Sequence, residues 1–148
     1  MEINYYQNTV FNKYSLSYNI MNNDGTEIGT AEGYCNVYGD LVTVIKIFSH
    51  QQKGIGFRSF EKIYNELNSK VHIKRLKASW SSGYEFETFP DSMSTNLKIF
   101  QDCMANESNA DKCAFSTPTG KWALKIGFNK ITYISISKEE VIVDFEKQ

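Results

Sequence analysis

The sequence has few of the residues that hold small domains together through crosslinks or metals. It contains two prolines and three cysteines, and Cys35, Cys103 and Cys113 include no pair with the C-x-x-C spacing. An odd number of cysteines without this spacing argues against a disulfide framework and against a zinc site. We therefore expect buried or free thiols and no metal. Pairing of Cys103 with Cys113 across their loop is expected only in an oxidising compartment.

The chain also lacks an excess of charge and a long apolar run. Sixteen basic side chains stand against seventeen acidic ones, for a formal net charge of -1. This balance gives no general attraction to nucleic acid or to an anionic membrane. The first four residues show no secretion signal, and no later segment approaches the length of a membrane span. These absences predict a soluble, cytoplasmic protein that binds neither nucleic acid nor membrane.

The composition is that of one folded domain. The chain has 148 residues, of which 41% are hydrophobic and 14% aromatic, including nine tyrosines and ten phenylalanines. Such a chain is long enough to bury a core without crosslinks, and its many aromatic residues favour a sheet-rich core. We predict a single domain over residues 1–148.

Side-chain periodicity in the first half predicts a three-strand meander, a helix and a further strand. Large apolar and polar residues alternate over 14–20, and strands are also predicted over 26–38 and 41–48. Apolar residues at helical spacing follow over 57–67. Alternation then resumes over 71–80, which predicts a strand parallel to the one before the helix. The pattern indicates an α/β (α+β) fold.

The second half contains a long polar stretch at about 81–118, with one predicted helix over 94–105. A loop-rich stretch of this length inside a domain is usually functional or is ordered by a partner. A short helix ended by glycine is predicted over 119–128, and strands over 131–137 and 141–145. The last strand could offer an exposed edge that pairs between subunits and gives a dimer.

The most specific motif is the segment Gln51-Gln52-Lys53-Gly54-Ile55-Gly56, which lies between a predicted strand and a predicted helix. Two closely spaced glycines allow a tight turn and leave backbone N–H groups uncovered at the N-terminus of the helix. The helix dipole favours an anion there. The segment is therefore interpreted as a phosphate-binding loop.

The sequence does not match two other phosphate-binding motifs. The dinucleotide pattern G-x-G-x-x-G has Ser59 in place of its third glycine. A nucleoside-triphosphate loop fails because Lys121 is followed by Trp122 and because Phe115 replaces the first glycine. A simple connection between strand and helix, with no ligand, remains an alternative.

In the form Q-x-x-G-x-G the segment resembles the pyrophosphate loop of the GCN5-related N-acetyltransferases. The step from the late helix to Gly127-Phe128 is similar to a C-terminal signature of the same family. The resemblance implies an acyl-CoA N-acyltransferase fold, a mixed and mostly antiparallel sheet with a central splayed parallel pair and helices on both faces. Because only residues 1–13 precede the first clear strand, the family's N-terminal helices would be reduced.

The resemblance also implies acetyl-CoA as the co-substrate. Its pyrophosphate would lie against the backbone N–H groups of 52–56, with the side chain of Gln51 at the family's Gln/Arg position. The residues implied in cofactor binding are Ile47, Phe48, Gln51, Gln52, Lys53, Gly54, Ile55, Gly56, Phe57 and Arg58.

The catalytic residues depart from the family pattern. Family members often carry a glutamate on the strand before the glycine loop and a tyrosine on the late helix. Here 43–46 contain no acidic residue, and Ala123 stands where the tyrosine is expected. Glu85 and Glu87 are candidate bases and Tyr133 is a candidate acid.

Two functions from different classes follow from these features. The first is transfer of an acetyl group from acetyl-CoA to an amine by direct attack, the acceptor being unknown and a protein amine being one candidate. The alternative is an inactive scaffold that acts on a protein partner as an inhibitor or immunity-type protein. A third reading is a generic α+β domain whose glycine loop is only a turn.

Overall fold

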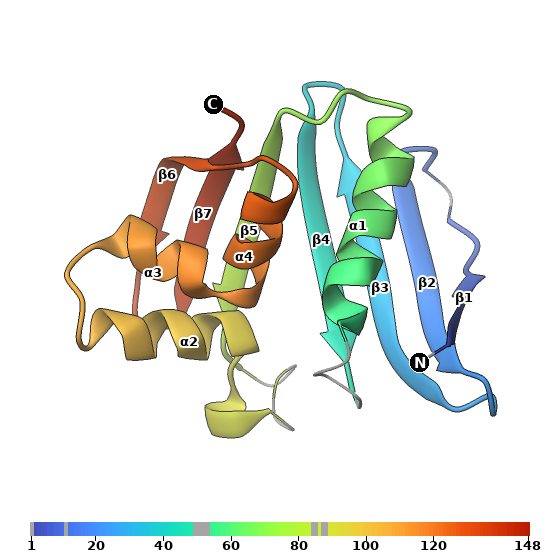
Figure 1. Ribbon diagram of the computed structural model, residues 1–148, viewed down its shortest axis with the longest axis horizontal. Helices are drawn as coiled ribbons and strands as arrows, with labels where there is room; N and C mark the ends of the chain where they lie inside the picture. Colours follow the sequence, from blue (N-terminus) through green and yellow to red (C-terminus); the bar gives the residue numbers. More distant parts are fainter. Residues whose placement is uncertain (1, 11, 49–53, 84–85, 87–88) are drawn as a thin grey trace. The chain divides into compact units, whose positions relative to one another are not determined.

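The computed structural model describes residues 2–48, 54–83, 86 and 89–148, except residue 11 (Figure 1). The chain divides into two compact units, residues 1–74 and residues 75–148. Among the described residues, no helix is both long and apolar enough to cross a membrane.

The first unit is an antiparallel meander of four strands followed by one helix. Each strand pairs with the next along the chain. Tight turns between strands are stabilised by asparagine side chains: Asn36 Oδ1, for example, accepts hydrogen bonds from the N–H groups of Tyr38 and Asp40 at 2.9 and 3.1 Å. The elements are β1 (Ile3–Gln7), β2 (Ser15–Asn22), β3 (Glu27–Cys35), β4 (Asp40–Ile47) and α1 (Ile55–Asn68).

Helix α1 packs against the middle of this sheet through its apolar side chains. Phe60, Ile63 and Leu67 of the helix are almost fully buried, as expected for residues spaced by one helical turn. The helix approaches β3 closely because Gly33 has no side chain. A Cβ atom at Gly33 would overlap Cγ2 of Ile63. This contact fixes how near the helix lies to the strand.

The strand β1 was not predicted, whereas the other three strands of the first unit were. Its sequence Ile-Asn-Tyr-Tyr-Gln lacks a clean alternation, and only Ile3 is buried. The strand forms because its backbone pairs with β2, an interaction between residues far apart in sequence. Between β1 and β2 the described residues contain no helix, so the N-terminal helices of the resembling family are absent there.

The second unit contains three strands and three α-helices. Strand β7 lies between β5 and β6 and is antiparallel to both. The predicted exposed edge at 141–145 is therefore wrong: β7 is central in this unit, and β6 pairs only on one side among the described residues. The elements are β5 (Arg75–Ser81), the 3₁₀-helix η3 (Pro90–Ser92), α2 (Thr95–Met104), α3 (Ala110–Ser116), α4 (Pro118–Lys125), β6 (Lys130–Ile136) and β7 (Glu140–Glu146).

Aromatic side chains form the core of the second unit. The ring of Trp80 on β5 lies 6.0 Å from that of Phe100 on α2 and 6.5 Å from that of Phe145 on β7. Phe115 on α3 contacts Phe145 at 5.5 Å. These spacings are typical of favourable aromatic pairs. Helices α2 and α3 are thus attached to the strands through aromatic contacts.

The stretch at 81–118 is more helical than its polar sequence predicts. The predicted helix over 94–105 is confirmed as α2, with the side chain of Ser94 capping its N-terminus. Helix α3 was missed because it is short. Its N-terminus is capped by Asn109, and Thr117 caps the N-terminus of α4 directly afterwards.

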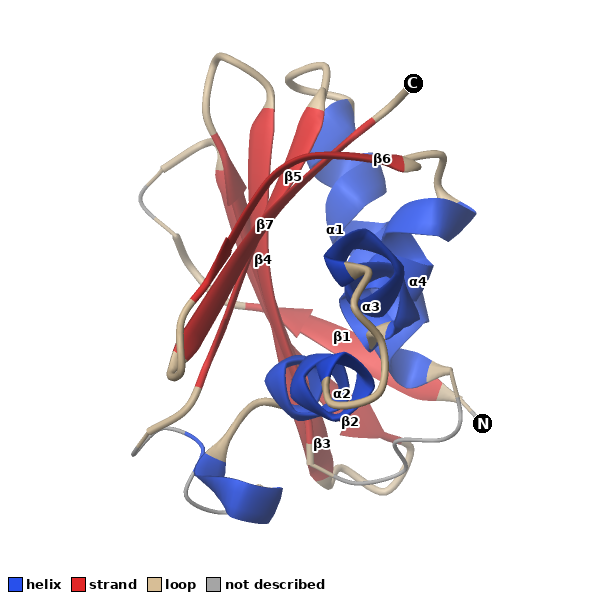
Figure 2. Ribbon diagram, turned by 90° about the vertical axis from the view of Figure 1, so that its left-hand side faces the viewer, coloured by secondary structure: helices blue, strands red, loops and turns tan. Residues whose placement is uncertain are grey.

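Within each unit the described helices cover one face of the strands (Figure 2). The opposite face carries exposed side chains, such as Glu32 and Tyr34 in the first unit and Lys77 and Ser79 in the second. This differs from the expected helices on both faces. The helices that the expectation required at the N-terminus are replaced by β1, which extends the sheet and covers neither face.

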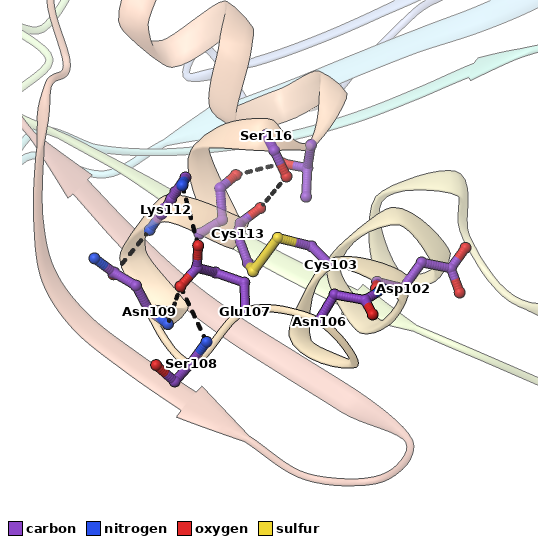
Figure 3. Close-up of a disulfide and its surroundings, with 11 residues drawn as sticks. Asp102, Cys103, Asn106, Glu107, Ser108, Asn109, Lys112, Cys113 and Ser116 are labelled. Carbon is purple, nitrogen blue, oxygen red and sulfur yellow. Dashed lines mark hydrogen bonds and ion pairs between the residues drawn. A yellow bond between two sulfur atoms is a disulfide. The ribbon is translucent and has the colours of Figure 1, made fainter.

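The expectation of three free or buried thiols is wrong for two of them. Cys103 and Cys113 form a disulfide, with their Cα atoms 5.5 Å apart (Figure 3). Only Cys35 is a free thiol, and it is buried. This is the pair that the sequence suggested for an oxidising compartment. Spacing alone could not establish it, because α2 and α3 bring the two residues together only when both helices pack on the same core.

The contact between Gly33 and Ile63 gives a direct test of the packing of α1. We expect Gly33→Ala to destabilise the protein by about 1–3 kcal/mol, because a methyl group would be forced against the buried helix. The free energy of unfolding is measured by urea titration. Ile63→Leu, which removes Cγ2, is the matched control. The double variant should lose less than the sum of the single losses, and strict additivity would contradict the contact.

Candidate cofactor-binding site

The candidate site lies at the start of α1. Gly54 is the N-cap residue and adopts a left-handed conformation with φ 73° and ψ 12°. As a glycine, Gly54 makes no side-chain cap bond at this end of the helix, and the first turn contains no acidic residue. A Cβ atom at Gly54 would meet no atom of the described residues within 4 Å, so this part of the chain leaves the space beside it open. An open helix N-terminus of this kind favours an anion.

The strand that leads toward this helix ends at two residues of the predicted site. Ile47 is the last residue of β4 and is partly buried opposite Gly29. Phe48 follows it, donates its N–H to the carbonyl of Ile28 at 2.8 Å, and leaves its ring 56% exposed. An exposed phenylalanine at a strand end is available to contact a ligand.

Positive charge follows along α1. The guanidinium of Arg58 is exposed and lies 6.0 Å from the ring centre of Tyr5 on β1. One turn later, Nζ of Lys62 lies 5.2 Å from the Tyr5 ring and 5.0 Å from the ring of Tyr18 on β2. The hydroxyl groups of Tyr5 and Ser59 share a hydrogen bond of 2.9 Å. Cation–π contacts of this kind orient both basic side chains.

A carboxylate completes this arrangement. The Tyr18 hydroxyl donates to Glu66 Oε2 at 2.5 Å, and Lys62 Nζ donates to Glu66 Oε1 at 2.9 Å. Burial, together with the hydrogen bond and charge of Glu66, raises the pKa of Tyr18 above its usual value. We call Tyr5, Tyr18, Lys62 and Glu66 the tyrosine cluster. The sequence analysis missed it, because its members come from β1, β2 and α1.

Several predicted residues lie outside the described part of the chain. These are Gln51, Gln52 and Lys53 of the glycine loop and the candidate bases Glu85 and Glu87. The described members of the loop, Gly54, Ile55, Gly56, Phe57 and Arg58, are brought together in the first turn of α1 by their position in sequence.

The candidate acid Tyr133 belongs to the second unit. It lies on β6 opposite Asp144 of β7, and its side chain is 52% exposed. Asp91, which follows Glu85 and Glu87 in the same stretch, has a left-handed backbone with φ 56° and accepts a hydrogen bond from Lys98 Nζ at 2.7 Å.

The two positions at which the resemblance expects catalytic side chains are occupied differently. The middle of β4 carries Thr43, Val44, Ile45 and Lys46 and no carboxylate. Ala123 on α4 is fully buried in the second unit, so a tyrosine would not fit there without repacking.

Two basic side chains of β5 form ion pairs within the second unit. Arg75 contacts Glu146, and Lys77 contacts Asp144, in both cases with an N–O distance of 3.3 Å. These ion pairs join β5 to β7 and give the basic side chains a structural role. No group of three or more metal-ligating side chains occurs in the described part of the chain.

Comparison with known proteins finds matches in structure and none in sequence. No protein-family model and no curated protein matches the chain. The solved structures that match include the aminoglycoside 6'-N-acetyltransferase from Enterococcus faecium, at 14% identity and a TM-score of 0.52. The match covers 93% of this chain and 76% of that enzyme.

Two further matches have the same character. An aminoglycoside 6'-N-acetyltransferase solved with coenzyme A matches at 15% identity and a TM-score of 0.52, covering 92% of this chain and 73% of the enzyme. Nourseothricin acetyltransferase matches at 10% identity and a TM-score of 0.51, and the match covers 91% of this chain and 65% of that enzyme. At these identities the likeness is one of fold. It confirms the predicted fold class.

The tyrosine cluster predicts a distinct pH dependence. The folded state holds the Tyr18 proton more tightly than the unfolded chain, so this contribution to stability is complete below pH 10.0 and is lost as the pH rises above it. We expect Tyr18→Phe to lower the free energy of unfolding by about 1–2 kcal/mol at neutral pH. In this variant the free energy of unfolding should also fall less steeply as the pH rises above 10.0. Urea unfolding over a pH series measures both. The exposed Tyr38 supplies the control Tyr38→Phe, and equal alkaline slopes for wild type and Tyr18→Phe would refute the assignment.

Proposed function

We propose that this chain, which has the fold of the GCN5-related N-acetyltransferases, transfers an acetyl group from acetyl-CoA to an amine. The observation that carries the proposal is the start of α1. Gly54 is left-handed and has no side chain to cap the helix, the described residues leave the space beside it open, and Arg58 adds exposed positive charge within the first turn. Coenzyme A presents a pyrophosphate that such a helix end can bind.

The residues present fit this group. The backbone N–H groups of 54–57 and the side chain of Arg58 would hold the pyrophosphate, together with Gln51, Gln52 and Lys53 of the same loop. Ile47 and Phe48 would contact the arm that leads to the thioester. A thioester supplies an acyl group activated toward attack by an amine. An acidic residue in the first turn would oppose anion binding, and this helix has none there.

The proposed reaction is a direct attack on the thioester carbonyl. The acceptor must lose an ammonium proton before attack, and the departing thiolate must be protonated or stabilised. We assign the first role to Glu85 or Glu87 and the second to Tyr133. The hydroxyl of Tyr133 is borne on a half-exposed side chain, as a group that exchanges protons with a substrate needs to be.

The connection between β1 and β2 affects how much room an acceptor has. Strand β1 leads to β2 without a helix in the described residues, so a wall that two helices would form is missing. We propose a bulky amine acceptor, such as a protein amine, and a cytoplasmic location.

A second candidate function is that of a binding protein that keeps the scaffold without catalysis. The specific observation in its favour is that the middle of β4, residues 43–46, has no carboxylate and that the buried Ala123 stands where a tyrosine is expected. In this case the protein would act through a protein partner as an inhibitor or immunity-type protein.

Calorimetric titration with acetyl-CoA, coenzyme A and pantetheine tests the proposal. We expect saturable binding of the first two and none of pantetheine, which lacks the pyrophosphate. A ligand concentration of 100 times the dissociation constant should raise the melting temperature by about 5–10 °C. Gly56→Glu should weaken binding at least about tenfold, because it places a carboxylate at the anion site.

The matched control is Asn65→Glu, which introduces the same charge at an exposed position later in α1. It should bind coenzyme A like the wild type. No saturable binding to a folded wild-type protein would rule out the acetyltransferase proposal. Binding of acetyl-CoA without release of free coenzyme A in the presence of amine acceptors would favour the binding protein.

A further inference from the structure

The disulfide between Cys103 and Cys113 joins two helices of the second unit. Cys103 lies in the last turn of α2 and Cys113 in the middle of α3. The bond spans ten positions in sequence and closes the connection between the helices, residues 105–109 (Figure 3). It is therefore a local crosslink.

The two cysteines of the disulfide differ in their exposure to solvent. Cys113 is fully buried, whereas Cys103 is partly exposed at the end of its helix. Thiol–disulfide exchange requires an incoming thiolate to reach one of the two sulfur atoms. Cys103 is the one that solvent approaches.

Apart from the disulfide, the connection between the helices is restrained by local hydrogen bonds of mostly exposed groups, such as that from the N–H of Asn106 to the carbonyl of Cys103 at 3.0 Å. Glu107 accepts hydrogen bonds from the N–H groups of Ser108 and Asn109 at 3.1 and 3.3 Å, and from Nζ of Lys112 at 3.0 Å (Figure 3). The side chain of Lys112 in this ion pair is 70% exposed. Exposed ion pairs of this kind contribute little to the free energy of folding.

The helices themselves are held independently of the disulfide. Leu97 and Phe100 are almost fully buried and attach α2 to the core from its first two turns, whereas Cys103 lies in its last turn. Ala114 is fully buried, and Phe115 contacts Phe145, so α3 is held from its second half. Opening the bond would leave these contacts in place.

We propose that Cys103–Cys113 is a redox-sensitive clip that controls the order of residues 103–112, and that Cys103 is the site at which thiols attack it. A thiolate forms a bond to Sγ of Cys103, the bond between the two protein sulfurs breaks, and its electron pair leaves on Sγ of Cys113, which takes up a proton. A second thiolate then attacks the outer sulfur of the adduct. The products are two cysteine thiols and one molecule of oxidised small thiol.

The required reductant is a monothiol of the glutathione class or a dithiol. Reducing compartments keep such thiols reduced, whereas oxidising compartments preserve disulfides. The disulfide is thus expected to be formed in an oxidising compartment and reduced in a reducing one. This inference does not depend on acetyl transfer, and it is tested without any ligand.

The first test treats the folded wild-type protein with reduced glutathione, quenches with N-ethylmaleimide and maps the peptides by mass spectrometry. We expect a transient glutathione adduct on Cys103 and then two free thiols. The buried Cys35 is an internal control, and burial raises the pKa of its thiol, so it should stay unmodified. An adduct found mainly on Cys113, or a bond that opens only with denaturant, would overturn the proposal.

The second test measures amide hydrogen exchange in the oxidised and reduced protein. Amides of 105–112 should exchange at least about tenfold faster after reduction, while those of β7 should not change, because opening is local. The melting temperature should fall by about 5–10 °C. Equal exchange of 105–112 in both states would contradict the clip.

A variant repeats the second test without reductant. Cys103→Ser combined with Cys113→Ala removes the bond and keeps a small apolar side chain at the buried position. It should exchange like the reduced wild type. If this variant does not fold, the reduced wild type gives the same reading. Failure of the two cysteines to pair in oxidised glutathione would also reject the proposal.

Discussion

The close approach of α1 to β3 is the constraint on which the arrangement of the first unit depends. The helix lies where it does because Gly33 leaves room for Ile63, and the buried row of Phe60, Ile63 and Leu67 then fixes its rotation. Interiors are packed too densely for such a contact to shift freely. Once the rotation is set, Ser59, Lys62 and Glu66 face β1 and β2, where the two tyrosines meet them. The tyrosine cluster is therefore a consequence of the packing of one glycine.

The rotation of α1 also positions a side chain of the candidate site. Arg58 extends over the ring of Tyr5, so a strand at the edge of the sheet orients a charge at the start of the helix. The open conformation of Gly54 depends on a local property, the tolerance of glycine for a positive φ. The site thus combines a local backbone feature with a side chain that is positioned from a distant part of the sequence. Loss of β1 would leave the backbone feature intact but would release the arginine.

The second unit is built on a different principle. Helices α2 and α3 are attached to the strands by aromatic contacts, of Phe100 with Trp80 and of Phe115 with Phe145. The disulfide adds a restraint between the last turn of α2 and the middle of α3. These aromatic contacts do not require the crosslink. Its effect falls on the connection between two helices, which is why we assign it a regulatory and not a structural role.

Local patterns in the sequence predicted the strands β2 to β5, the helix α1, the helices α2 and α4 and the two C-terminal strands, because each has a clear local period or cap. They also predicted the glycine loop, whose chemistry depends on neighbouring residues, and through it the fold class. Tertiary structure was needed to establish the pairing of β1, the central place of β7, the tyrosine cluster and the bond between Cys103 and Cys113. Each of these joins residues that are distant along the chain or lie on separate elements. A periodic pattern states which face of an element is apolar, but it does not state which other element that face will meet.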